Sequence, residues 1–239
     1  MESYVLITGA SRGIGKNIAY MLASRNYNLI LICKNNFGLL RDLANTLSCQ
    51  YKVKVICKIC DISDPTQVES LFADIPAPDI IINNAGISYV GLLQDMSVKD
   101  WNTVIATNLS AAFYISKYAL KHMISKQSGR ILNISSVWGN TGASMEVAYS
   151  ASKGGLNAFT KSLAKEVAPS GIAVNALACG FVDTEMNSHL CDEEKEFLFD
   201  QIPAGRAVST QEVALTAIQI LEMPIYLTGQ IITLDGGWT

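Results

Sequence analysis

The sequence predicts an α/β fold in which a parallel sheet is covered by helices on both faces. Short apolar segments alternate with longer segments of helical periodicity along all 239 residues. The predicted strands are almost continuously hydrophobic, which is typical of strands buried on both faces. Hydrophobic residues make up 49% of the chain and charged residues only 16%, enough apolar surface for a large core. We therefore expect one doubly wound domain over residues 1–239.

Seven strands are predicted from β-rich segments bounded by turn residues. They are Tyr4 to Thr8, Asn28 to Cys33, Lys52 to Cys60, Asp79 to Asn83, Arg130 to Ser135, Ile172 to Ala178 and Gln230 to Leu234. Seven parallel strands with helices between them make a Rossmann-type sheet. Ligands of such sheets bind beyond the carboxyl ends of the strands, so the residues that follow each strand are the candidates for chemistry.

Six helices are predicted between these strands. They are Ile14 to Arg25, Phe37 to Ser48, Pro65 to Ala73, Ser97 to Lys126, Val147 to Ala168 and Thr210 to Glu222. Two have clear starting signals, because Asp64 is a candidate N-cap before Pro65, and Ser97 with Asp100 resembles a capping box.

The composition excludes several classes of partner. Lys and Arg number 18 against 21 Asp and Glu, a net charge of −3 without the basic excess that a nucleic-acid backbone requires. No apolar segment approaches the roughly 20 residues that cross a bilayer, and the N-terminus lacks the layout of a signal peptide. We expect a cytoplasmic protein whose partners include neither nucleic acid nor a membrane.

The six cysteines are expected to be packing residues in a reducing compartment. Cys57 and Cys60 have the spacing of a redox or zinc motif, but residues three apart on a strand point to opposite faces. No second cysteine pair completes a set of four zinc ligands. We expect no metal site.

A glycine-rich turn follows the first predicted strand and opens the first predicted helix. Backbone amides at such a turn, together with the helix N-terminus, suit the diphosphate of a dinucleotide. A tight turn without a ligand is the other interpretation, and the position within a first β-α-β unit favours the nucleotide. The candidate contacts are Gly9, Ser11, Arg12, Gly13, Ile14 and Gly15.

Two other motifs overlap this turn. The segment from Gly9 to Gly13 matches the G-x-S-x-G pattern of serine hydrolases, in which Ser11 would be the nucleophile. That reaction needs a histidine, and the two candidates, His122 and His189, fall within a helix and in a polar segment. A P-loop would need a glycine and a Ser or Thr at two positions where this chain has alanine and asparagine.

The end of the second predicted strand carries a cation instead of a carboxylate. A carboxylate there would accept hydrogen bonds from a free adenosine ribose. Lys34, together with Arg12, would instead neutralise a 2′-phosphate, which favours NADP(H) over NAD(H). A solvated surface lysine is the other interpretation.

Small and polar residues also follow the third and fourth predicted strands. Asp61 and Ile62 are placed to meet an adenine ring. Asn84, Ala85 and Gly86 allow the close approach of a ligand to the backbone.

A serine, a tyrosine and a lysine form the strongest catalytic candidate. Ser136 follows the fifth strand, while Tyr149 and Lys153 lie one turn apart on one face of the next helix. A nearby ammonium lowers the pKa of a phenol, so Lys153 is expected to make Tyr149 a better acid. Tyr149 would protonate a carbonyl oxygen held by Ser136 while a nicotinamide delivers hydride to the carbonyl carbon. Taken alone, Asn108 is more typical of a buried core amide.

Together these motifs resemble those of the short-chain dehydrogenase/reductase family, and the resemblance covers essentially the whole chain. It is carried by Thr8-Gly9-x-x-x-Gly13-x-Gly15, Asn83 to Gly86, Asn108, Ser136, Tyr149 and Lys153. The resemblance implies that Asn108 completes a tetrad by holding a water that links Lys153 to solvent, and that Lys153 also binds the nicotinamide ribose. It implies further contacts with NADP(H) from Lys34, Asp61, Ile62, Asn84, Ala85, Gly86, Tyr149, Lys153, Gly180, Val182 and Thr184.

Within that family the chain is most similar to 3-oxoacyl-acyl-carrier-protein reductases, from Tyr149 to Ala168 and from Leu227 to Gly237. The similarity implies an NADPH-dependent homotetramer that reduces a ketone borne by an acyl carrier protein to a secondary alcohol. The chain departs from the pattern at Cys179, where proline is usual. It also has Gln127 and Ser170 where such enzymes carry arginines that dock the carrier protein.

A second group is similar over Ser135 to Val147, Ala168 to Gly171 and the final Gly236-Gly237-Trp238. These are the bacterial elongation factor P 5-aminopentanone reductases, which reduce a ketone carried on a modified lysine. Both reductase alternatives imply the same cofactor and the same chemistry. A dinucleotide-binding module without catalytic activity is the alternative in which the protein is not an enzyme. The segment from Asp183 to Arg206, expected to be a mobile substrate lid, would decide between the two reductases.

Overall fold

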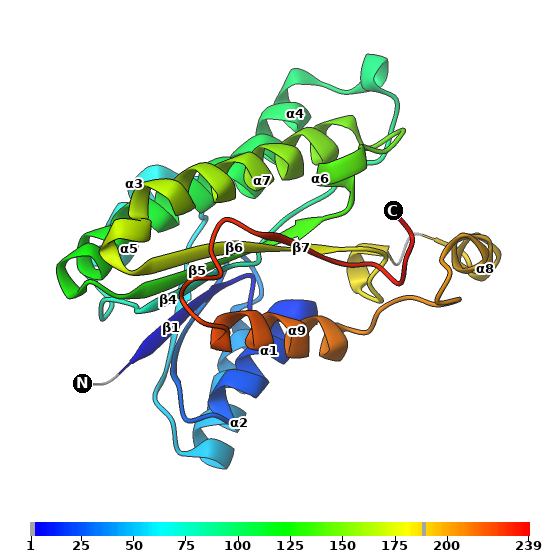
Figure 1. Cartoon of the computed structure of the whole chain (residues 1–239). Coiled ribbons are helices and arrows are strands. Elements are labelled where there is room, and N and C mark those ends of the chain that lie inside the picture. Colours follow the sequence, from blue (N-terminus) through cyan, green and yellow to red (C-terminus); the bar gives the residue numbers. More distant parts are fainter. Residues whose placement is uncertain (1–2, 188–189) are drawn as a thin grey trace.

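The computed structural model describes residues 3–187 and 190–239. Its seven strands pair in parallel in the order β3-β2-β1-β4-β5-β6-β7, which confirms the predicted sheet (Figure 1). The strands are β1 (Tyr4–Thr8), β2 (Asn28–Cys33), β3 (Val55–Ile59), β4 (Ile80–Asn83), β5 (Gly129–Ser136), β6 (Ile172–Cys179) and β7 (Ile231–Leu234).

Helices cover both faces of this sheet, as predicted (Figure 1). One face is covered by α1 (Gly13–Ala23), α2 (Phe37–Tyr51) and α9 (Thr210–Glu222). The other is covered by α3 (Pro65–Ala73), α5 (Ala111–Lys126) and α7 (Val147–Val167). The remaining helices are α4 (Val98–Ile105), α6 (Trp138–Thr141) and α8 (Asp192–Gln201), with short 3-10 turns at Leu93–Asp95, Ala168–Ser170 and Glu185–Asn187.

The two layers of helices enclose two hydrophobic cores, one on each side of the sheet. Successive side chains of a strand enter opposite cores, as Val5 and Leu6 of β1 do. Cys57 in β3 and Cys60 directly after it follow the same rule, since Cys57 packs against the first core and Cys60 lies in the second. Burial raises the pKa of both thiols to about 11, so both stay protonated and serve as packing groups. No group of three or more metal-ligating side chains occurs among the described residues.

The helix starts follow the predicted capping signals. The Asp64 side chain accepts hydrogen bonds from the Thr66 and Gln67 amides at the start of α3. The Ser97 hydroxyl accepts a bond from the Asp100 amide at the start of α4. Both helices therefore begin where the sequence predicts.

The structure corrects the expectation of one helix from Ser97 to Lys126. A π turn at Ala106–Ser110 separates α4 from α5, because an extra residue is accommodated there without breaking the chain's helical course. The predicted third strand also begins too early, since Lys52 has a left-handed backbone (φ +59°) that ends α2.

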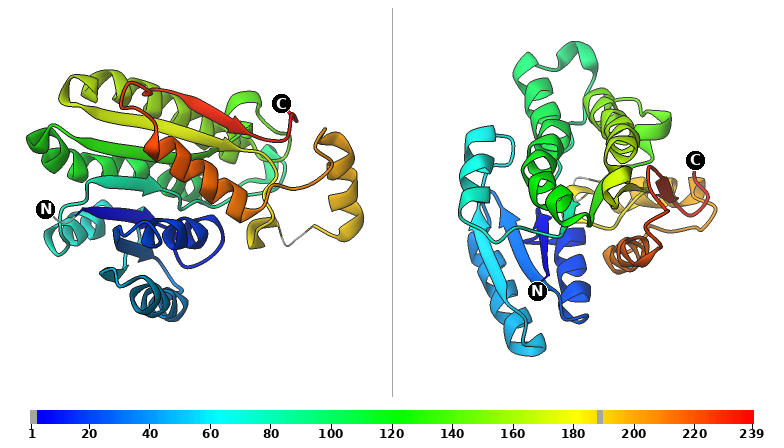
Figure 2. Two further views of the ribbon diagram at one scale, coloured as in Figure 1. Left: turned by 60° about the horizontal axis from the view of Figure 1, so that its bottom comes forward. Right: turned by 60° about the vertical axis from the view of Figure 1, so that its left-hand side comes forward.

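Helix α8 stands apart from the sheet, beyond its carboxyl edge (Figure 2). It lies within the segment expected to be a lid, and no residue of the helix is buried. Within the described part of the chain, no helix has the length and apolar character to cross a membrane.

Candidate active site

The glycine-rich turn after β1 packs tightly against the segment that follows β4. Gly9 has φ +65°, and a Cβ there would lie 2.9 Å from the Ala85 Cα. A Cβ on Gly15 would lie 2.6 Å from the Asn84 Nδ2 and from the Gly9 carbonyl oxygen. A Cβ built on Gly13, which has φ +55°, would meet only the Thr184 methyl, at 3.8 Å. The turn thus requires glycine for its own packing and leaves one side open above the start of α1.

Asn84 fixes the shape of this turn. Its amide group donates to the carbonyl oxygens of Thr8 (2.9 Å) and Gly9 (3.1 Å). In return the Thr8 hydroxyl accepts bonds from the Asn84 and Ala85 amides. These four bonds join the carboxyl ends of β1 and β4, so the predicted contact residues Asn84 and Ala85 also position the turn.

The two cations predicted to face a 2′-phosphate each pair with a carboxylate. The Lys34 Nζ lies 2.6 Å from Asp61, and Arg12 pairs with Glu185. Burial raises the pKa of the Asp61 carboxyl, but hydrogen bonds from Lys34 and Ser63 outweigh burial and hold this pKa below its ordinary value. The Lys34 and Arg12 side chains remain 59% and 57% exposed, so both can still reach an anion.

The segment after β6 extends the same edge of the sheet. The Gly180 amide donates to the Leu234 carbonyl oxygen at 2.9 Å, and a Cβ on Gly180 would lie 2.9 Å from Asp235. Val182 is buried and bridges to Val208. Thr184 reaches the glycine-rich turn, since its methyl lies within 3.8 Å of a Cβ built on Gly13.

Ser136, Tyr149 and Lys153 meet at the carboxyl end of β5. Ser136 is the last residue of β5, and its hydroxyl accepts a bond from the Trp138 amide (3.2 Å). The Lys153 Nζ lies 5.6 Å from the centre of the Tyr149 ring and donates to the Ile134 carbonyl oxygen at 2.8 Å. The structure therefore brings together the three residues that the sequence singles out.

The electrostatics correct the expected effect of the lysine on the tyrosine. Burial raises the pKa of the Tyr149 phenol above its ordinary value, and the opposing effect of the Ser136 hydroxyl is smaller. Burial also lowers the pKa of the Lys153 ammonium to about 8. The pKa of the Tyr149 phenol therefore shifts in the direction opposite to the predicted one, because burial is the largest influence on it.

Asn108 lies in the π turn and makes three side-chain hydrogen bonds. Its Nδ2 donates to the Ile87 carbonyl oxygen (2.9 Å) and to the Ser152 hydroxyl (3.0 Å), and its Oδ1 accepts from the Ile87 amide (2.9 Å). A Cβ on Gly86 would lie 3.4 Å from the Asn108 Oδ1 and 3.5 Å from the Lys153 Nζ. Asn108 thus joins the segment after β4 to α7, close to the buried lysine.

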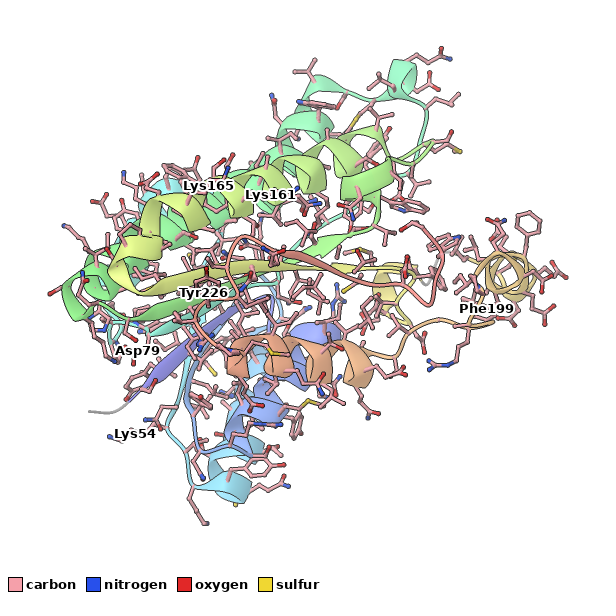
Figure 3. All side chains as sticks on the ribbon, in the orientation of Figure 1. Lys54, Asp79, Lys161, Lys165, Phe199 and Tyr226 are labelled. Carbon is pink, nitrogen blue, oxygen red and sulfur yellow. The ribbon has the colours of Figure 1, made fainter. Side chains whose placement is uncertain are left out.

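His122, a candidate histidine for a serine hydrolase, lies at the opposite end of the sheet from Ser11. His122 contacts Asp79 at 3.1 Å, and Asp79 precedes β4 at the amino end of the sheet, far from α8 and its Phe199 (Figure 3). Ser11 follows β1 at the carboxyl end. The other candidate, His189, lies outside the described residues.

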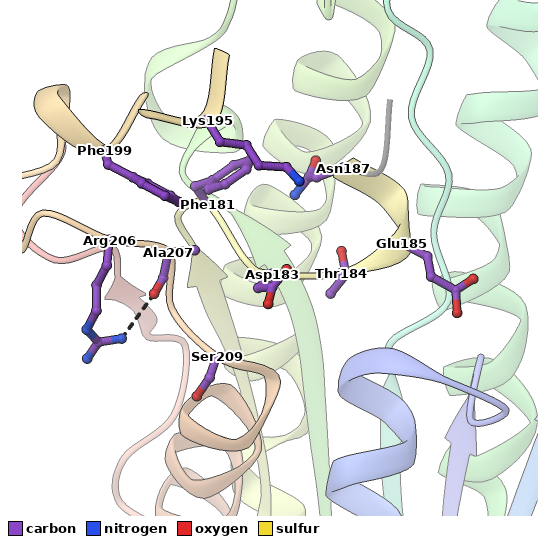
Figure 4. A pocket seen from close by; sticks show the side chains of 10 residues that line it. All are labelled: Phe181, Asp183, Thr184, Glu185, Asn187, Lys195, Phe199, Arg206, Ala207 and Ser209. Atoms are coloured by element: carbon purple, nitrogen blue, oxygen red, sulfur yellow. Dashed lines mark hydrogen bonds between the residues drawn. The ribbon is translucent and has the colours of Figure 1, made fainter. Parts of the chain in front are cut away.

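A cavity of about 590 Å³ lies between the segment after β6, α8 and the start of α9 (Figure 4). The Phe181 and Phe199 rings, 6.1 Å apart, form one wall. Arg206 is held by two bonds to Glu212, at 2.6 and 2.9 Å. The residues that line the cavity are Phe181, Asp183, Thr184, Glu185, Asn187, Lys195, Phe199, Arg206, Ala207 and Ser209. The expected lid segment therefore has a hollow beside Thr184.

Glu146 and Ser88, which bond to each other near the start of α7, are absent from the sequence-based set. Glu146 lies three residues before Tyr149 and accepts a hydrogen bond from Ser88. The pair was missed because Ser88 and Glu146 are 58 residues apart and meet only in the folded chain. The three-residue spacing from Tyr149 was the only available signal.

Comparison with known proteins decides the family. The model of the short chain dehydrogenase family matches residues 3–195. This chain belongs to the short-chain dehydrogenases. The chain is 42% identical to the uncharacterized oxidoreductase YmfI of Bacillus subtilis over 100% of this chain and 99% of that protein. It is 39% identical to the 3-oxoacyl-[acyl-carrier-protein] reductase FabG of Escherichia coli, over 97% of this chain and 95% of that protein. The FabG of Aquifex aeolicus is also 39% identical, with the same coverage.

Proposed function

We propose that this oxidoreductase uses NADPH to reduce a ketone to a secondary alcohol, and that it is of the 3-oxoacyl-(acyl-carrier-protein) reductase type. The observation that carries the proposal is the convergence of Ser136, Tyr149 and Lys153 at the carboxyl end of β5. The similarity to FabG, whose name states that reaction, supports it. The single domain over residues 1–239 and the cytoplasmic location, both expected from composition and sequence pattern, belong to the same proposal. So does the homotetramer, which the family resemblance implies.

The residues at the carboxyl edge fit a dinucleotide. Gly13 leaves room above the α1 N-terminus, where backbone amides favour a diphosphate. Lys34 and Arg12 offer exposed cations for a 2′-phosphate, and Asp61 with Ile62 would meet the adenine. The further proposed contacts are Gly9, Ser11, Ile14, Gly15, Asn84, Ala85, Gly86, Tyr149, Lys153, Gly180, Val182 and Thr184.

Tyr149 would act as the acid. Its raised pKa keeps the phenol protonated at neutral pH, so the proton is available for a carbonyl oxygen that gains negative charge. The Ser136 hydroxyl would hold that oxygen, because it lies beside the phenol. A bound nicotinamide would supply hydride to the carbonyl carbon.

Lys153 would stabilise the phenolate that remains after proton transfer. Its ammonium is buried, and the Ile134 carbonyl oxygen holds it under the tyrosine ring. Its pKa of about 8 also makes it able to release a proton near neutral pH. Asn108, close to the same Nζ, would hold the water that returns this proton from solvent.

Replacement of Tyr149 tests the proposal. Tyr149→Phe removes the proton donor and keeps the ring, so kcat for ketone reduction should fall at least about a thousandfold, within the range of general acid catalysis. NADPH binding, followed by fluorescence titration, should stay within about twofold. Tyr226→Phe, on an exposed side chain, is the matched control. Retained turnover in Tyr149→Phe would remove the tyrosine from the chemistry.

A second candidate is the reduction of a lysine-borne ketone on elongation factor P. The Trp138 and Trp238 rings pack 4.8 Å apart, which places the C-terminal tryptophan of that resemblance beside the helix after Ser136. Gln127 and Ser170 further weaken the case for docking a carrier protein, since both are uncharged. Parallel assays with an acetoacetyl thioester and a ketone-bearing elongation factor P distinguish the candidates by their kcat/KM.

A further inference from the structure

A buried asparagine on α7 joins the end of β5 to the short helix that follows it. Asn157 lies one helical turn after Lys153 and is buried. Its Oδ1 accepts from the Ser135 hydroxyl at 2.6 Å, and its Nδ2 donates to the Asn140 Oδ1 at 2.8 Å. Ser135 directly precedes Ser136 on β5, and Asn140 belongs to α6. One side-chain amide therefore bonds to the chain on both sides of Ser136.

Helix α6 lies close against α7 at this point. A Cβ built on Gly139 would lie 2.7 Å from the Lys153 carbonyl carbon and 2.9 Å from the Asn157 Nδ2. The position has no room for a side chain, so the backbone of α6 lies directly on α7. The bond from Asn157 to Asn140 is made across this contact and holds α6 in place.

The start of α6 contacts the serine of the site. The Trp138 amide donates to the Ser136 hydroxyl oxygen at 3.2 Å, the upper limit of an ordinary N–H···O bond. A hydroxyl has one hydrogen and two acceptor positions, so an amide at one acceptor position restricts where the hydrogen points. In the proposed reaction that hydrogen is donated to the carbonyl oxygen of the ketone. A small displacement of α6 would therefore change how Ser136 meets the ketone.

From these contacts we infer that Asn157 is a positioning residue for ketone reduction. By holding α6 on α7, its side-chain amide keeps the Trp138 amide on the Ser136 hydroxyl and so directs that hydroxyl toward the ketone. The inference rests on the proposed ketone reduction and adds to it a residue outside the tetrad.

A second buried hydrogen bond between β5 and α7 supplies a matched control. The Asn133 Nδ2 donates to the Thr160 Oγ1 at 2.8 Å, and both side chains are buried. Thr160 lies three residues after Asn157 on α7, and its bond joins the same strand and helix without involving α6. Thr160→Val and Asn157→Leu each leave one polar side chain of β5 without this partner, so each should lower the urea midpoint.

Asn157→Leu removes both bonds of the amide and keeps the approximate size of the side chain. With the whole enzyme and an acetoacetyl thioester, kcat should fall about tenfold, while the NADPH Kd and KM stay within about twofold. Complete loss of one such donor costs about a hundred- to a thousandfold. We expect less because the Val137 amide, which donates to the Cys179 carbonyl oxygen at 3.0 Å, also holds the start of α6. Thr160→Val should leave kcat within about twofold of the natural chain.

A double-mutant cycle with Ser136→Ala separates positioning from a general loss of stability. Single-turnover oxidation of NADPH measures the reduction step in all four forms. If Asn157 acts through Ser136, Asn157→Leu should change this rate less than about twofold once the serine is absent. An equal fall in both backgrounds would overturn the inference, because Asn157 would then act on another group. An unchanged kcat in Asn157→Leu, or the same fall in Thr160→Val, would overturn it as well.

Asn140 provides a second variant at an exposed position. Asn140→Ala removes the acceptor of the Asn157 bond and should lower kcat about threefold, and Asn140→Asp, which keeps an Oδ acceptor, should restore it. Equal kcat in the natural chain and Asn140→Ala would contradict the inference even if Asn157→Leu failed to fold.

Failure of the inference differs from failure of the proposed function. Each contradicting result above leaves ketone reduction by the natural chain intact. Absence of turnover by the natural chain on the acetoacetyl thioester and on the ketone-bearing elongation factor P, with normal NADPH binding, would overturn the proposed function and this inference with it.

Discussion

At the scale of single residues, the lowered pKa of Lys153 predicts a pH dependence of the reaction. Its pKa of about 8 means that the ammonium is lost as pH rises through about 8, whereas Tyr149, with its raised pKa, stays protonated. We expect kcat/KM for reduction to be level below about pH 7 and to fall about tenfold per pH unit well above pH 8. Initial rates from about pH 6 to pH 10 measure this profile.

Lys153→Arg is the matched variant for that profile. A guanidinium keeps its charge throughout this range, so whatever activity remains should lack the fall at high pH. A fall at the same pH in both forms would assign the titration to another group.

The cofactor preference also depends on single residues. Lys34→Asp replaces an exposed cation with a carboxylate, which would repel a 2′-phosphate and accept bonds from a ribose hydroxyl. The ratio of kcat/KM with NADPH to that with NADH should fall at least about a hundredfold and reverse, since one close charge contact is replaced by repulsion. Lys99→Asp, on the exposed face of α4, is the control. An unchanged ratio would remove Lys34 from the cofactor site.

At the scale of elements, the π turn between α4 and α5 places Asn108 where its side chain bonds both to Ile87, after β4, and to Ser152 on α7. Asn108→Ala would leave the Ile87 amide and carbonyl oxygen without their side-chain partner in two partly buried hydrogen bonds, a cost of about 1–3 kcal/mol. We expect a lower urea midpoint and a larger loss of kcat than of NADPH affinity. Thr103→Ala, one turn earlier on the exposed side of α4, should change neither by as much.

The elements that the sequence predicts well are those with a strong periodic pattern or a capping residue. The bounds of α3 and α9 agree with the prediction at both ends. Asp64 and Ser209 cap the starts of these two helices. The π turn was missed because periodicity is judged over windows of about 11–18 residues, which are longer than the five residues of Ala106–Ser110. Helix α8 was missed because it buries no residue, and α6 because four residues carry no period.

In the candidate site, too, sequence patterns identify residues with a regular spacing but not the effects of burial or of contacts between distant segments. Motif spacing identified Ser136, Tyr149 and Lys153, since each follows a strand or shares a helix face. The direction of the Tyr149 pKa shift was not accessible, because it depends on how deeply the phenol and the ammonium are buried. Glu146 and Ser88 meet only through the folding of two distant segments.

At the scale of the whole molecule, exposed apolar side chains on α4 and α5 support the proposed homotetramer. Val98, Phe113 and Ile124 are large hydrophobic residues exposed to solvent in the single chain. We expect sedimentation equilibrium to give four times the chain mass of 25.8 kDa. Phe113→Asp should reduce this mass, because a charge would be buried in the interface.

Leu39→Asp provides the control for that experiment. Leu39 is equally exposed, but it lies on α2, on the other side of the sheet. A natural chain that sediments as a monomer would contradict the assembly.

The unequal burial of the cysteines makes the molecule suited to site-selective labelling. Cys49 on α2 and Cys191 at the start of α8 are exposed, whereas Cys33, Cys60 and Cys179 are buried. A maleimide dye pair would therefore attach to the first two thiols without cysteine engineering. Energy transfer between the dyes would then report, in the unmutated enzyme, whether the α8 segment approaches the nucleotide-binding half when cofactor and ketone are added.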